Sequence, residues 1–294
     1  MCYKEKHIKR VKKLDKTFLI IGGDERLEIL YKSLIYKNIK VEHIFYDVSA
    51  KKENELEKIK KADILVFPVP LTSDKKTLFA PKISYSVNLE EIINLSHKNQ
   101  VIFGGGEAEE LFKEKNYNNL LSDESMTLKN AMATAEAALS IIIKNTRKTV
   151  LGSKILILGY GRIAKILADY LKALNAEIVI AARRNSVRTL AEINGFKVCD
   201  FGKELETQLG ADVIINTVPK KIISNNELTK IKSETLVLDL ASKPGGVDKV
   251  AAKSLGVNYI HALSLPGIYS PISSAKYIED SVFNTLNLTR GEIS

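Results

Sequence analysis

The run Gly159-Tyr160-Gly161-Arg162-Ile163-Ala164 has the residue types and spacing that most directly suggest chemistry. It follows a short apolar stretch and opens an amphipathic one, so strand, turn and helix come in order. Gly159 permits a tight turn, Gly161 lets the backbone approach a pyrophosphate, and small Ala164 allows close helix packing. The start of the helix then faces the negative charge. The run predicts a dinucleotide-binding turn, with a half-exposed Tyr160 ring; a turn that has lost its nucleotide is the alternative.

The next predicted strand leads into Arg183, Arg184 and Ser186, where an NAD site usually offers an acidic side chain to the ribose hydroxyls. That carboxylate is missing here. Arginine can instead bind a 2′-phosphate through charge-assisted hydrogen bonds, and Ser186 and Arg188 can add donors. The sequence therefore predicts NADP(H) over NAD(H); a solvated loop that happens to carry arginines is the alternative.

Apolar runs alternate with amphipathic stretches almost throughout, which is typical of parallel strands joined by helices. We expect an α/β protein with two Rossmann-like, doubly wound parallel sheets joined by a long helix, and a C-terminal helix that packs back on the first domain. The expected parts are an N-terminal substrate domain (1–123, with 1–16 as a flexible basic tail and not a targeting signal), a linking helix (124–147), an NADP-binding Rossmann domain (148–271) and a C-terminal helix (272–294).

Predicted strands place several loops at the carboxyl ends of the two sheets, where open α/β proteins bind ligands. The strands are expected at 17–24, 40–46, 64–67 and 101–103, and at 154–158, 177–181, 213–216, 235–240 and 258–261. The candidate loops are Phe67–Pro70, Asn216–Pro219, Ala241–Gly246 and Leu265–Pro271, and Asn216, Thr217 and Pro219 are expected to touch the cofactor.

A weaker glycine-rich turn, Gly22-Gly23-Asp24-Glu25-Arg26, lacks the spacing of a dinucleotide site. Its backbone N–H groups, with Arg26, can surround an anionic substrate, or the turn can be an ordinary strand-to-helix connection. Both interpretations stay open.

The composition is that of a soluble globular protein, with 45% hydrophobic and 27% charged residues in a chain of 294. The formal charge of +9 comes largely from scattered lysines and no nucleic-acid module is recognisable, so no nucleic-acid partner is predicted. No apolar run reaches the ~18 residues of a membrane helix, so no membrane association is expected. The few cysteines and histidines lie far apart, which predicts a cytoplasmic protein without disulfide or metal site: Cys2, Cys199, His7, His43, His97 and His261.

Five separated motifs, in order, resemble the family of dipicolinate synthase A subunits over nearly the whole chain. They are Ile20–Asp24, Asn130–Ala138, the Gly159 turn with Ala181-Ala182-Arg183, Asp239–Asp248, and Leu265-Pro266-Gly267. More distantly, the arrangement is similar to 2-hydroxyacid dehydrogenases, alanine dehydrogenase and adenosylhomocysteinase, in which two α/β domains enclose the nicotinamide. The catalytic His–carboxylate pair of the hydroxyacid dehydrogenases has no match, because the spacing from His261 to Pro266 does not fit.

The resemblance implies an oxidoreductase that makes dipicolinic acid, the pyridine dicarboxylate of bacterial spores, during sporulation. It implies that the product of dihydrodipicolinate synthase, 4-hydroxy-tetrahydrodipicolinate or dihydrodipicolinate, is oxidised with NADP in the mother-cell cytoplasm. The implied partner is the flavoprotein-like B subunit of dipicolinate synthase, and a homo-oligomer is left open.

A substrate with two carboxylates needs cations, hydroxyls and backbone N–H donors around it. The expected substrate-binding residues are Arg26, Thr134, Ser242, Gly245, Pro266 and Gly267. Aromatisation also removes a proton, and Glu136 and Lys243 are the predicted catalytic residues. The alternatives are a buried structural carboxylate for Glu136 and a surface charge for Lys243.

Two other functions remain open. One is a nucleotide-binding regulatory subunit whose flavoprotein partner performs the chemistry, since no clear acid–base dyad is visible. The other is a different NADP-linked dehydrogenase acting on an amino acid or a folate, because a fold does not fix a function.

Overall fold

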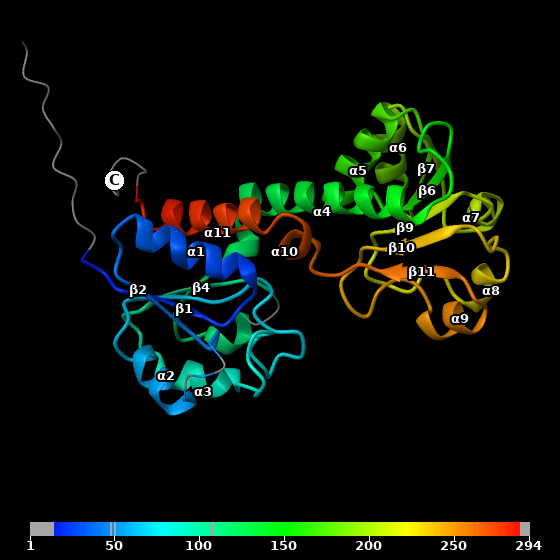
Figure 1. Cartoon of the computed structure of the whole chain (residues 1–294). Helices are drawn as coiled ribbons and strands as arrows, with labels where there is room; N and C mark the ends of the chain where they lie inside the picture. Colours follow the sequence, from blue (N-terminus) through cyan, green and yellow to red (C-terminus); the bar gives the residue numbers. More distant parts are fainter. Residues whose placement is uncertain (1–14, 48, 50, 107–108, 289–294) are drawn as a thin grey trace, which may run out of the picture. The chain divides into compact units, whose positions relative to one another are not determined.

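The computed structural model describes residues 15–47, 49, 51–106 and 109–288. The chain divides into two compact units, one made of the residues up to Thr127 with those from Pro271 onward, the other of Leu128–Ser270. Most of the predicted tail at 1–16 lies outside the described residues, as do Cys2 and His7. Each unit has its own parallel sheet (Figure 1), so the expected α/β class with two Rossmann-like sheets is confirmed.

The first unit has a five-stranded parallel sheet in the order β2-β1-β3-β4-β5. Its strands are β1 (Phe18–Ile21), β2 (Val41–Ile44), β3 (Ile64–Val66), β4 (Val101–Gly104) and β5 (Asn116–Asn119). Its helices are α1 (Glu25–Tyr36), α2 (Lys52–Ile59), α3 (Leu89–Leu95) and α11 (Pro271–Thr285), with short 3-10 turns at Glu109–Phe112 and Leu120–Ser122. Apolar clusters lie on both faces of this sheet, and for that reason β1 is apolar and buried at every position.

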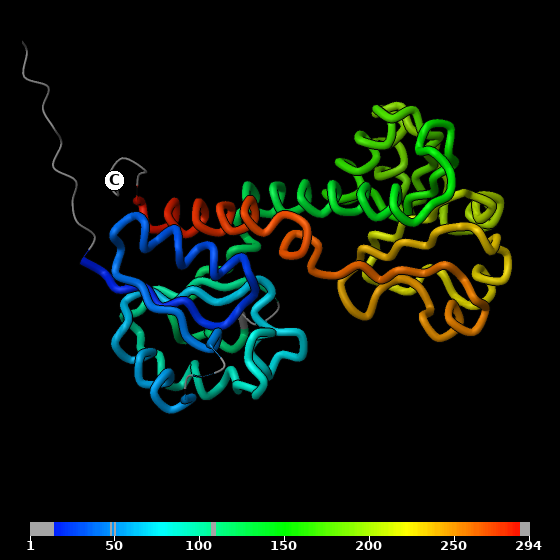
Figure 2. The backbone as a smooth tube through the Cα atoms, viewed as in Figure 1, coloured from blue at the N-terminus to red at the C-terminus, as the bar shows by residue number. Residues whose placement is uncertain are grey.

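The C-terminal helix α11 packs on α1, as the sequence predicts, and Figure 2 shows the last described segment running beside the first helix. Ile278 of α11 and Leu30 of α1 belong to one apolar cluster. The buried carboxylate of Glu279 accepts hydrogen bonds from Ser33 Oγ and Lys37 Nζ, both at 2.7 Å. A polar clamp therefore fixes the register of the two helices.

The second unit has a six-stranded parallel sheet in the order β11-β10-β9-β6-β7-β8. Its strands are β6 (Lys154–Leu158), β7 (Glu177–Ala181), β8 (Lys197–Cys199), β9 (Val213–Asn216), β10 (Leu236–Asp239) and β11 (Asn258–His261). Its helices are α5 (Arg162–Ala173), α6 (Asn185–Ile193), α7 (Lys203–Gln208), α8 (Asn225–Leu228), α9 (Lys249–Ser254) and α10 (Leu265–Tyr269), with most of α4 (Glu124–Asn145). Numbered from β6, this is the order 3-2-1-4-5-6 of a dinucleotide-binding sheet, read from the other edge.

Successive side chains of β6 enter different cores, because neighbouring residues of a strand point to opposite faces. Ile155 and Ile157 join the cluster formed with α4, α5 and α6. Leu156 and Leu158 join the cluster formed with α7, α8 and α9. Both faces of the sheet are covered, and its internal strands β6, β7, β9 and β10 read as nearly continuous apolar runs.

Three elements differ from the sequence-based expectations. Strand β5 is formed by Asn-Tyr-Asn-Asn and strand β8 by Lys-Val-Cys, and both are edge strands that pair on one side only. Neither carries the apolar pattern of an internal strand. The loop expected at Leu265–Pro271 is wrong, since Leu265–Tyr269 is a short helix with proline in its first turn, where a missing N–H costs nothing. In the described part of the chain, no helix combines the length and the apolar character needed to cross a bilayer.

Candidate functional site

The glycine-rich turn lies at the carboxyl end of β6, between its neighbours β7 and β9. The strand order reverses here, and such a switch point is where open α/β sheets bind ligands. Helix α5 starts with Gly161 as its N-cap and with no capping side chain. Within the described residues, the N–H groups of Gly161 and Ile163 have no acceptor. These donors are therefore available to an anion at the positive end of the helix.

The two glycines of the turn are needed for different reasons. Gly159 has a φ of +92°, and a Cβ there would lie 2.6 Å from Thr217 Oγ1. At Gly161 a Cβ would meet no atom within 4 Å, so the space above this residue is open. The fold itself requires Gly159, whereas the open backbone at Gly161 fits the close approach of a diphosphate.

Tyr160, between these glycines, points away from the open side of the turn. It is 7% exposed and belongs to the apolar cluster of α5 and α6. Its hydroxyl accepts a hydrogen bond from Asn194 Nδ2 at 2.9 Å, its ring packs edge-on against Phe196, and burial raises the pKa of the phenol. The expected half-exposed ring is therefore wrong, because the side chain is part of the core. Only the backbone of Tyr160 can face a ligand.

The loop from β7 to α6, together with the first turn of α6, gathers groups that favour an anion. Arg183, Arg184 and Ser186 are exposed, and neither of the two guanidinium groups hydrogen-bonds to any other described residue. In the described chain, the backbone N–H groups of residues 183–186 also lack acceptors. Arg188 differs from the expectation: its guanidinium binds groups of this loop and is not a free donor.

The turn after β9 closes the other side of the switch point. Thr217 donates from both its N–H and its Oγ1 to the carbonyl of Leu158, at 3.0 and 2.8 Å. The side chain of Asn216 donates to the carbonyl of Val218 and accepts from its N–H. Pro219, next along, is exposed. The structure therefore brings three predicted cofactor residues to the edge of the phosphate turn.

Asp239, the last residue of β10, opens one of the five motifs of the resemblance, but the sequence predicted no role for its side chain. Its carboxylate is fully buried and accepts hydrogen bonds from Asn216 Nδ2 at 2.7 Å, Gly246 N–H at 2.9 Å and Ala241 N–H at 3.1 Å. Burial, and then the charge of Asp239, raise the pKa of Tyr259, whose hydroxyl lies 3.5 Å away. An acid within an apolar strand was the available signal, since a buried charge needs partners.

The loop after β10 carries two predicted residues outward from this buried anchor. Gly245 lies against the carboxylate, where a Cβ would come within 2.7 Å of Asp239 Oδ2. Ser242 and Lys243 are exposed, and the Lys243 ammonium has no partner in the described part of the chain. His261 Nε2 lies 2.8 Å from the carbonyl of Ala241. The loop thus presents a hydroxyl and a cation at the carboxyl edge of the sheet.

The remaining candidates of this unit are more scattered. Pro266 and Gly267 are buried within α10. Thr134 is 7% exposed, and its hydroxyl donates to the carbonyl of Asn130 one helical turn earlier. Glu136 is exposed, so the alternative of a buried structural carboxylate is wrong. Among the described residues, no hydrogen bond or ion pair joins Glu136 to Lys243.

In the first unit, Arg26 is held by its own surroundings. It is 4% exposed, forms a bidentate contact with Asp24, and donates from Nη2 to the carbonyl of Val69 at 2.6 Å. The N–H groups of Gly22 and Gly23 donate to the carbonyls of Ile44 and Phe79. These two backbone donors are thus used within the unit, which favours the ordinary connection over an anion-binding turn.

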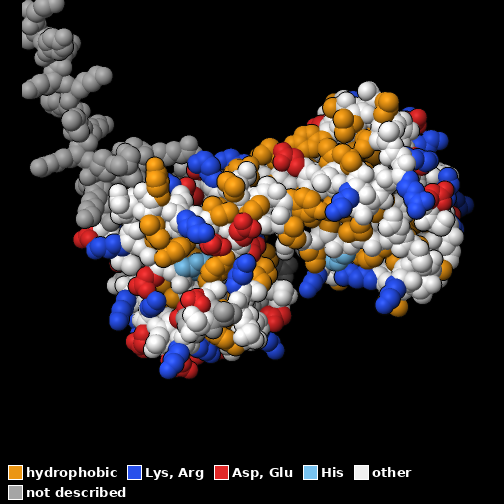
Figure 3. Space-filling model, in the orientation of Figure 1, with side chains coloured by type: hydrophobic (Ala, Val, Ile, Leu, Met, Phe, Trp, Pro, Cys, Tyr) orange, Lys and Arg blue, Asp and Glu red, His pale blue; other side chains and the backbone are white. Residues whose placement is uncertain are grey.

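Charged side chains and potential metal ligands also lie outside the phosphate turn and the loops around it. Figure 3 shows Lys and Arg interspersed with Asp and Glu on the visible face of both units. No group of three or more His, Cys, Asp and Glu side chains that could hold a metal ion occurs among the residues that the structure describes.

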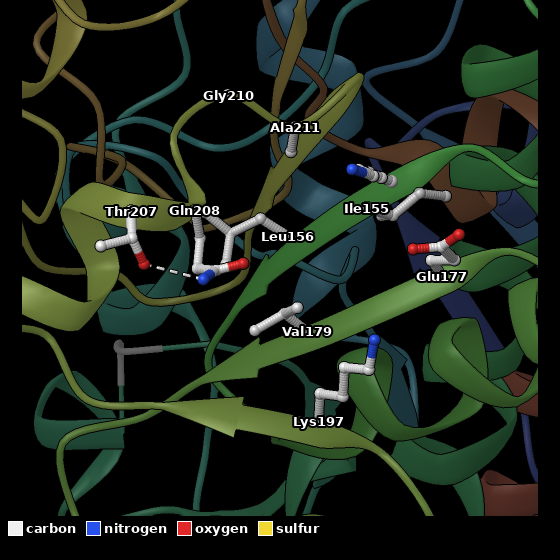
Figure 4. Close-up of a pocket in the computed structure, with 10 residues that line it drawn as sticks. Ile155, Leu156, Glu177, Val179, Lys197, Thr207, Gln208, Gly210 and Ala211 are labelled. Carbon is white, nitrogen blue, oxygen red and sulfur yellow. Dashed lines mark hydrogen bonds between the residues drawn. The ribbon is translucent and has the colours of Figure 1, made fainter.

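A cavity of about 360 Å³ lies on the second sheet, at the amino ends of β6 and β7 (Figure 4). Leu156 and Val179 lie on its strands, and Thr207 and Gln208 come from the end of α7. Because the phosphate turn is at the carboxyl ends of the same strands, this cavity contains none of the predicted site residues.

Comparisons with known proteins match both parts of the chain. Residues 17–136 match the family described as the N-terminal domain of the dipicolinate synthase A subunit. Residues 129–249 match the D-isomer specific 2-hydroxyacid dehydrogenase NAD binding domain. The second match contains the phosphate turn and the β7–α6 loop, and it supports a nicotinamide dinucleotide as the cofactor.

Known relatives point in the same direction. The dipicolinate synthase A subunit from Bacillus subtilis (strain 168) is 32% identical over 161 residues, 54% of each chain, so the match spans about half of this curated relative. The crystal structure of the corresponding protein from Bacillus halodurans has a TM-score of 0.82 and 25% identity, covering 92% of this chain and 98% of that one. That of the Bacillus subtilis protein has a TM-score of 0.78 and 23% identity, with 92% and 96% covered. This chain is thus similar to the A subunit of dipicolinate synthase, in its first part to the N-terminal domain of that subunit and in its second part to the NAD binding domain of 2-hydroxyacid dehydrogenases.

Proposed function

We propose that this chain is the nicotinamide-dependent subunit of a dipicolinate synthase, with NADP⁺ as the oxidant. The observation that carries the cofactor choice is the β7–α6 loop. Arg183 and Arg184 are exposed there, have no partner among the described residues, and belong to a stretch, Ala182–Ser186, that contains no Asp or Glu. Two guanidinium groups and free backbone N–H groups suit a 2′-phosphate, which a ribose-binding carboxylate would repel.

The proposed reaction is the oxidation of a cyclic dicarboxylate to its aromatic form. Dihydrodipicolinate loses a hydride to the nicotinamide and a proton to a base, which leaves pyridine dicarboxylate, NADPH and a proton. If the 4-hydroxylated precursor is the substrate, one water is lost first. The similarity to the A subunit of dipicolinate synthase supports this substrate class.

The residues proposed for the substrate lie on the loop anchored by Asp239. Lys243, whose ammonium has no partner among the described residues, offers a cation to a substrate carboxylate, and Ser242 offers a hydroxyl beside it. Glu136, exposed on α4, is the proposed proton acceptor. Gly161 and Ile163 would hold the diphosphate with their N–H groups.

A second candidate keeps the binding site but moves the chemistry to a partner. His261 contacts a backbone carbonyl instead of a carboxylate. No hydrogen bond or ion pair joins the two proposed catalytic residues in the described chain. A nucleotide-binding chain whose flavoprotein-like partner performs the chemistry fits these facts. Under both candidate functions, we propose that the chain forms a complex with such a partner.

The test is an assay of the purified chain for dipicolinate, with and without the candidate partner, by ultraviolet absorbance of the product and by cofactor reduction. The proposal expects NADPH and dipicolinate to appear in equal amounts. Lys243→Ala should raise the substrate KM, whereas Lys197→Ala, an exposed lysine at the opposite edge of the same sheet, should not. Product without NADP⁺ reduction would favour the second candidate, and no product under any condition would reject the proposed reaction.

A further inference from the structure

Arg188 of α6 binds the loop that precedes its own helix. Its Nη1 donates to the carbonyl of Ala182 at 2.7 Å and to that of Arg183 at 2.9 Å. Its Nη2 lies 3.3 Å from Asn185 Oδ1. One planar guanidinium thus spans two backbone carbonyls of the β7–α6 loop and the side chain of Asn185, the first residue of α6, which a single ammonium cannot match in geometry.

The two carbonyl contacts also set the direction of two backbone N–H groups. In a planar trans peptide, the C=O of one residue and the N–H of the next point in opposite directions. By holding the carbonyls of Ala182 and Arg183, Arg188 directs the N–H groups of Arg183 and Arg184 away from itself. These same N–H groups lack an acceptor within the described residues. The carbonyl oxygens of Ala182 and Arg183 would repel an anion, and they point toward the Arg188 guanidinium instead.

We propose that Arg188 is a positioning residue for recognition of the 2′-phosphate of NADP(H), acting through the loop and not by touching the ligand. It orients the N–H groups of Arg183 and Arg184 and, through the backbone, the exposed guanidinium groups of both residues. This inference rests on the proposed cofactor. It adds that selectivity for NADP(H) over NAD(H) depends on a residue whose own donors are turned inward.

A merely structural role predicts something different. If Arg188 only stabilised α6, its loss would lower thermal stability and weaken the binding of NADP⁺ and the binding of NAD⁺ by the same factor. A positioning role acts on the one part that distinguishes the two cofactors, so the ratio of their dissociation constants must change. This ratio is the readout, and it does not depend on turnover.

The experiment measures binding of NADP⁺, NAD⁺ and adenosine 2′,5′-bisphosphate to the full chain by calorimetry. Variants Arg188→Met and Arg188→Lys are compared with Lys172→Met, because Lys172 also donates to a backbone carbonyl, that of Asn194 at 2.8 Å, at the far end of α6. We expect Arg188→Met to raise the dissociation constants of NADP⁺ and of the bisphosphate by about tenfold, which corresponds to the displacement of one charge-assisted hydrogen bond. The dissociation constant of NAD⁺ should rise by less than about twofold. Arg188→Lys should fall between, and Lys172→Met should keep the wild-type ratio.

Two outcomes separate the inference from the proposal on which it rests. If the wild type prefers NADP⁺ and the Arg188 variants keep that ratio, Arg188 has no positioning role, while the proposed cofactor stands. If the wild type prefers NAD⁺, both fail. Should Arg188→Met not fold, Arg188→Lys decides on the same ratio.

Discussion

The carboxylate of Asp239 accepts a hydrogen bond from the side-chain amide of Asn216 at 2.7 Å, and this contact ties the end of β10 to the end of β9. The same carboxylate holds the N–H groups of Ala241 and Gly246, at the two ends of the loop that carries Lys243. A single buried acid therefore sets the positions of groups from two adjacent strand ends.

Replacing Asp239 by alanine should lower the free energy of unfolding by roughly 2–4 kcal/mol, because several buried donors lose their acceptor at once. Denaturant unfolding measures this loss. The control is Asp169→Ala, an exposed acid on α5, for which a change within about 0.5 kcal/mol is expected. Equal small changes for both variants would mean that the Asp239 network contributes little.

Alanine substitutions at the two glycines of the phosphate turn should affect different properties, stability at Gly159 and cofactor binding at Gly161. Gly159→Ala forces a side chain into a positive φ and against Thr217, so we expect a stability loss of about 1–3 kcal/mol. Gly161→Ala enters open space and should change stability by less than about 0.5 kcal/mol. It should nevertheless weaken the dinucleotide by about tenfold or more, because the added methyl occupies the approach of the diphosphate.

Thermal unfolding and cofactor titration of both variants test the contrast. If Gly161→Ala binds NADP⁺ with the affinity of the wild type, the diphosphate does not bind at Gly161.

The phosphate turn could be predicted because its signals are local. A buried strand, glycines at fixed spacing and an amphipathic helix follow one another between residues 154 and 174, and each constrains the next. Edge strands β5 and β8 could not be predicted in this way. Each is held by backbone pairing to one neighbour, β4 or β7, and pairing leaves little trace in the side chains.

Tyr160 is expected to serve the core and not the cofactor. Tyr160→Phe removes the acceptor of Asn194 while keeping the ring against Phe196, so unfolding should become easier by about 1 kcal/mol. The dissociation constant of the cofactor should stay within about twofold of the wild-type value, because the lost hydroxyl lies on the core side of the turn. Fluorescence titration with NADPH checks this. A loss of cofactor affinity without a loss of stability would show that the Tyr160 hydroxyl contributes to cofactor binding.

For site residues, the sequence reveals charge but not what the charged group contacts. Arg26, Arg183 and Arg188 all follow strands and look alike as candidates. The structure separates them: Arg26 is buried and paired with Asp24, Arg188 donates to backbone carbonyls, and Arg183 is exposed with no partner among the described residues. Such distinctions depend on contacts between residues far apart in the chain, or on a side chain that folds back along its helix. Neither appears in residue type or spacing.

Asp212 gives a prediction for pH. The hydrogen bond from Lys148 Nζ, with a further one from the N–H of Lys154, holds the pKa of this carboxyl below its ordinary value of 3.8. A carboxyl with a lowered folded pKa stabilises the protein fully above its unfolded pKa, and this stabilisation is lost as the pH falls through the folded value. Asp212→Asn should therefore lower the free energy of unfolding at neutral pH, by no more than about 1 kcal/mol because Lys148 is largely exposed.

The difference in the free energy of unfolding between wild type and Asp212→Asn should shrink once the pH drops below about 4. It should vanish where the Asp212 carboxyl is protonated in both the folded and the unfolded state. Urea unfolding at a series of pH values measures it, with Lys148→Met as the partner variant. Lys148→Met should show the same pH dependence relative to the wild type, since it removes the group that lowers the pKa. High salt should weaken the effect at neutral pH, because the pair is screened. A difference that persists unchanged to low pH would show that Asp212 acts through shape and not through its charge.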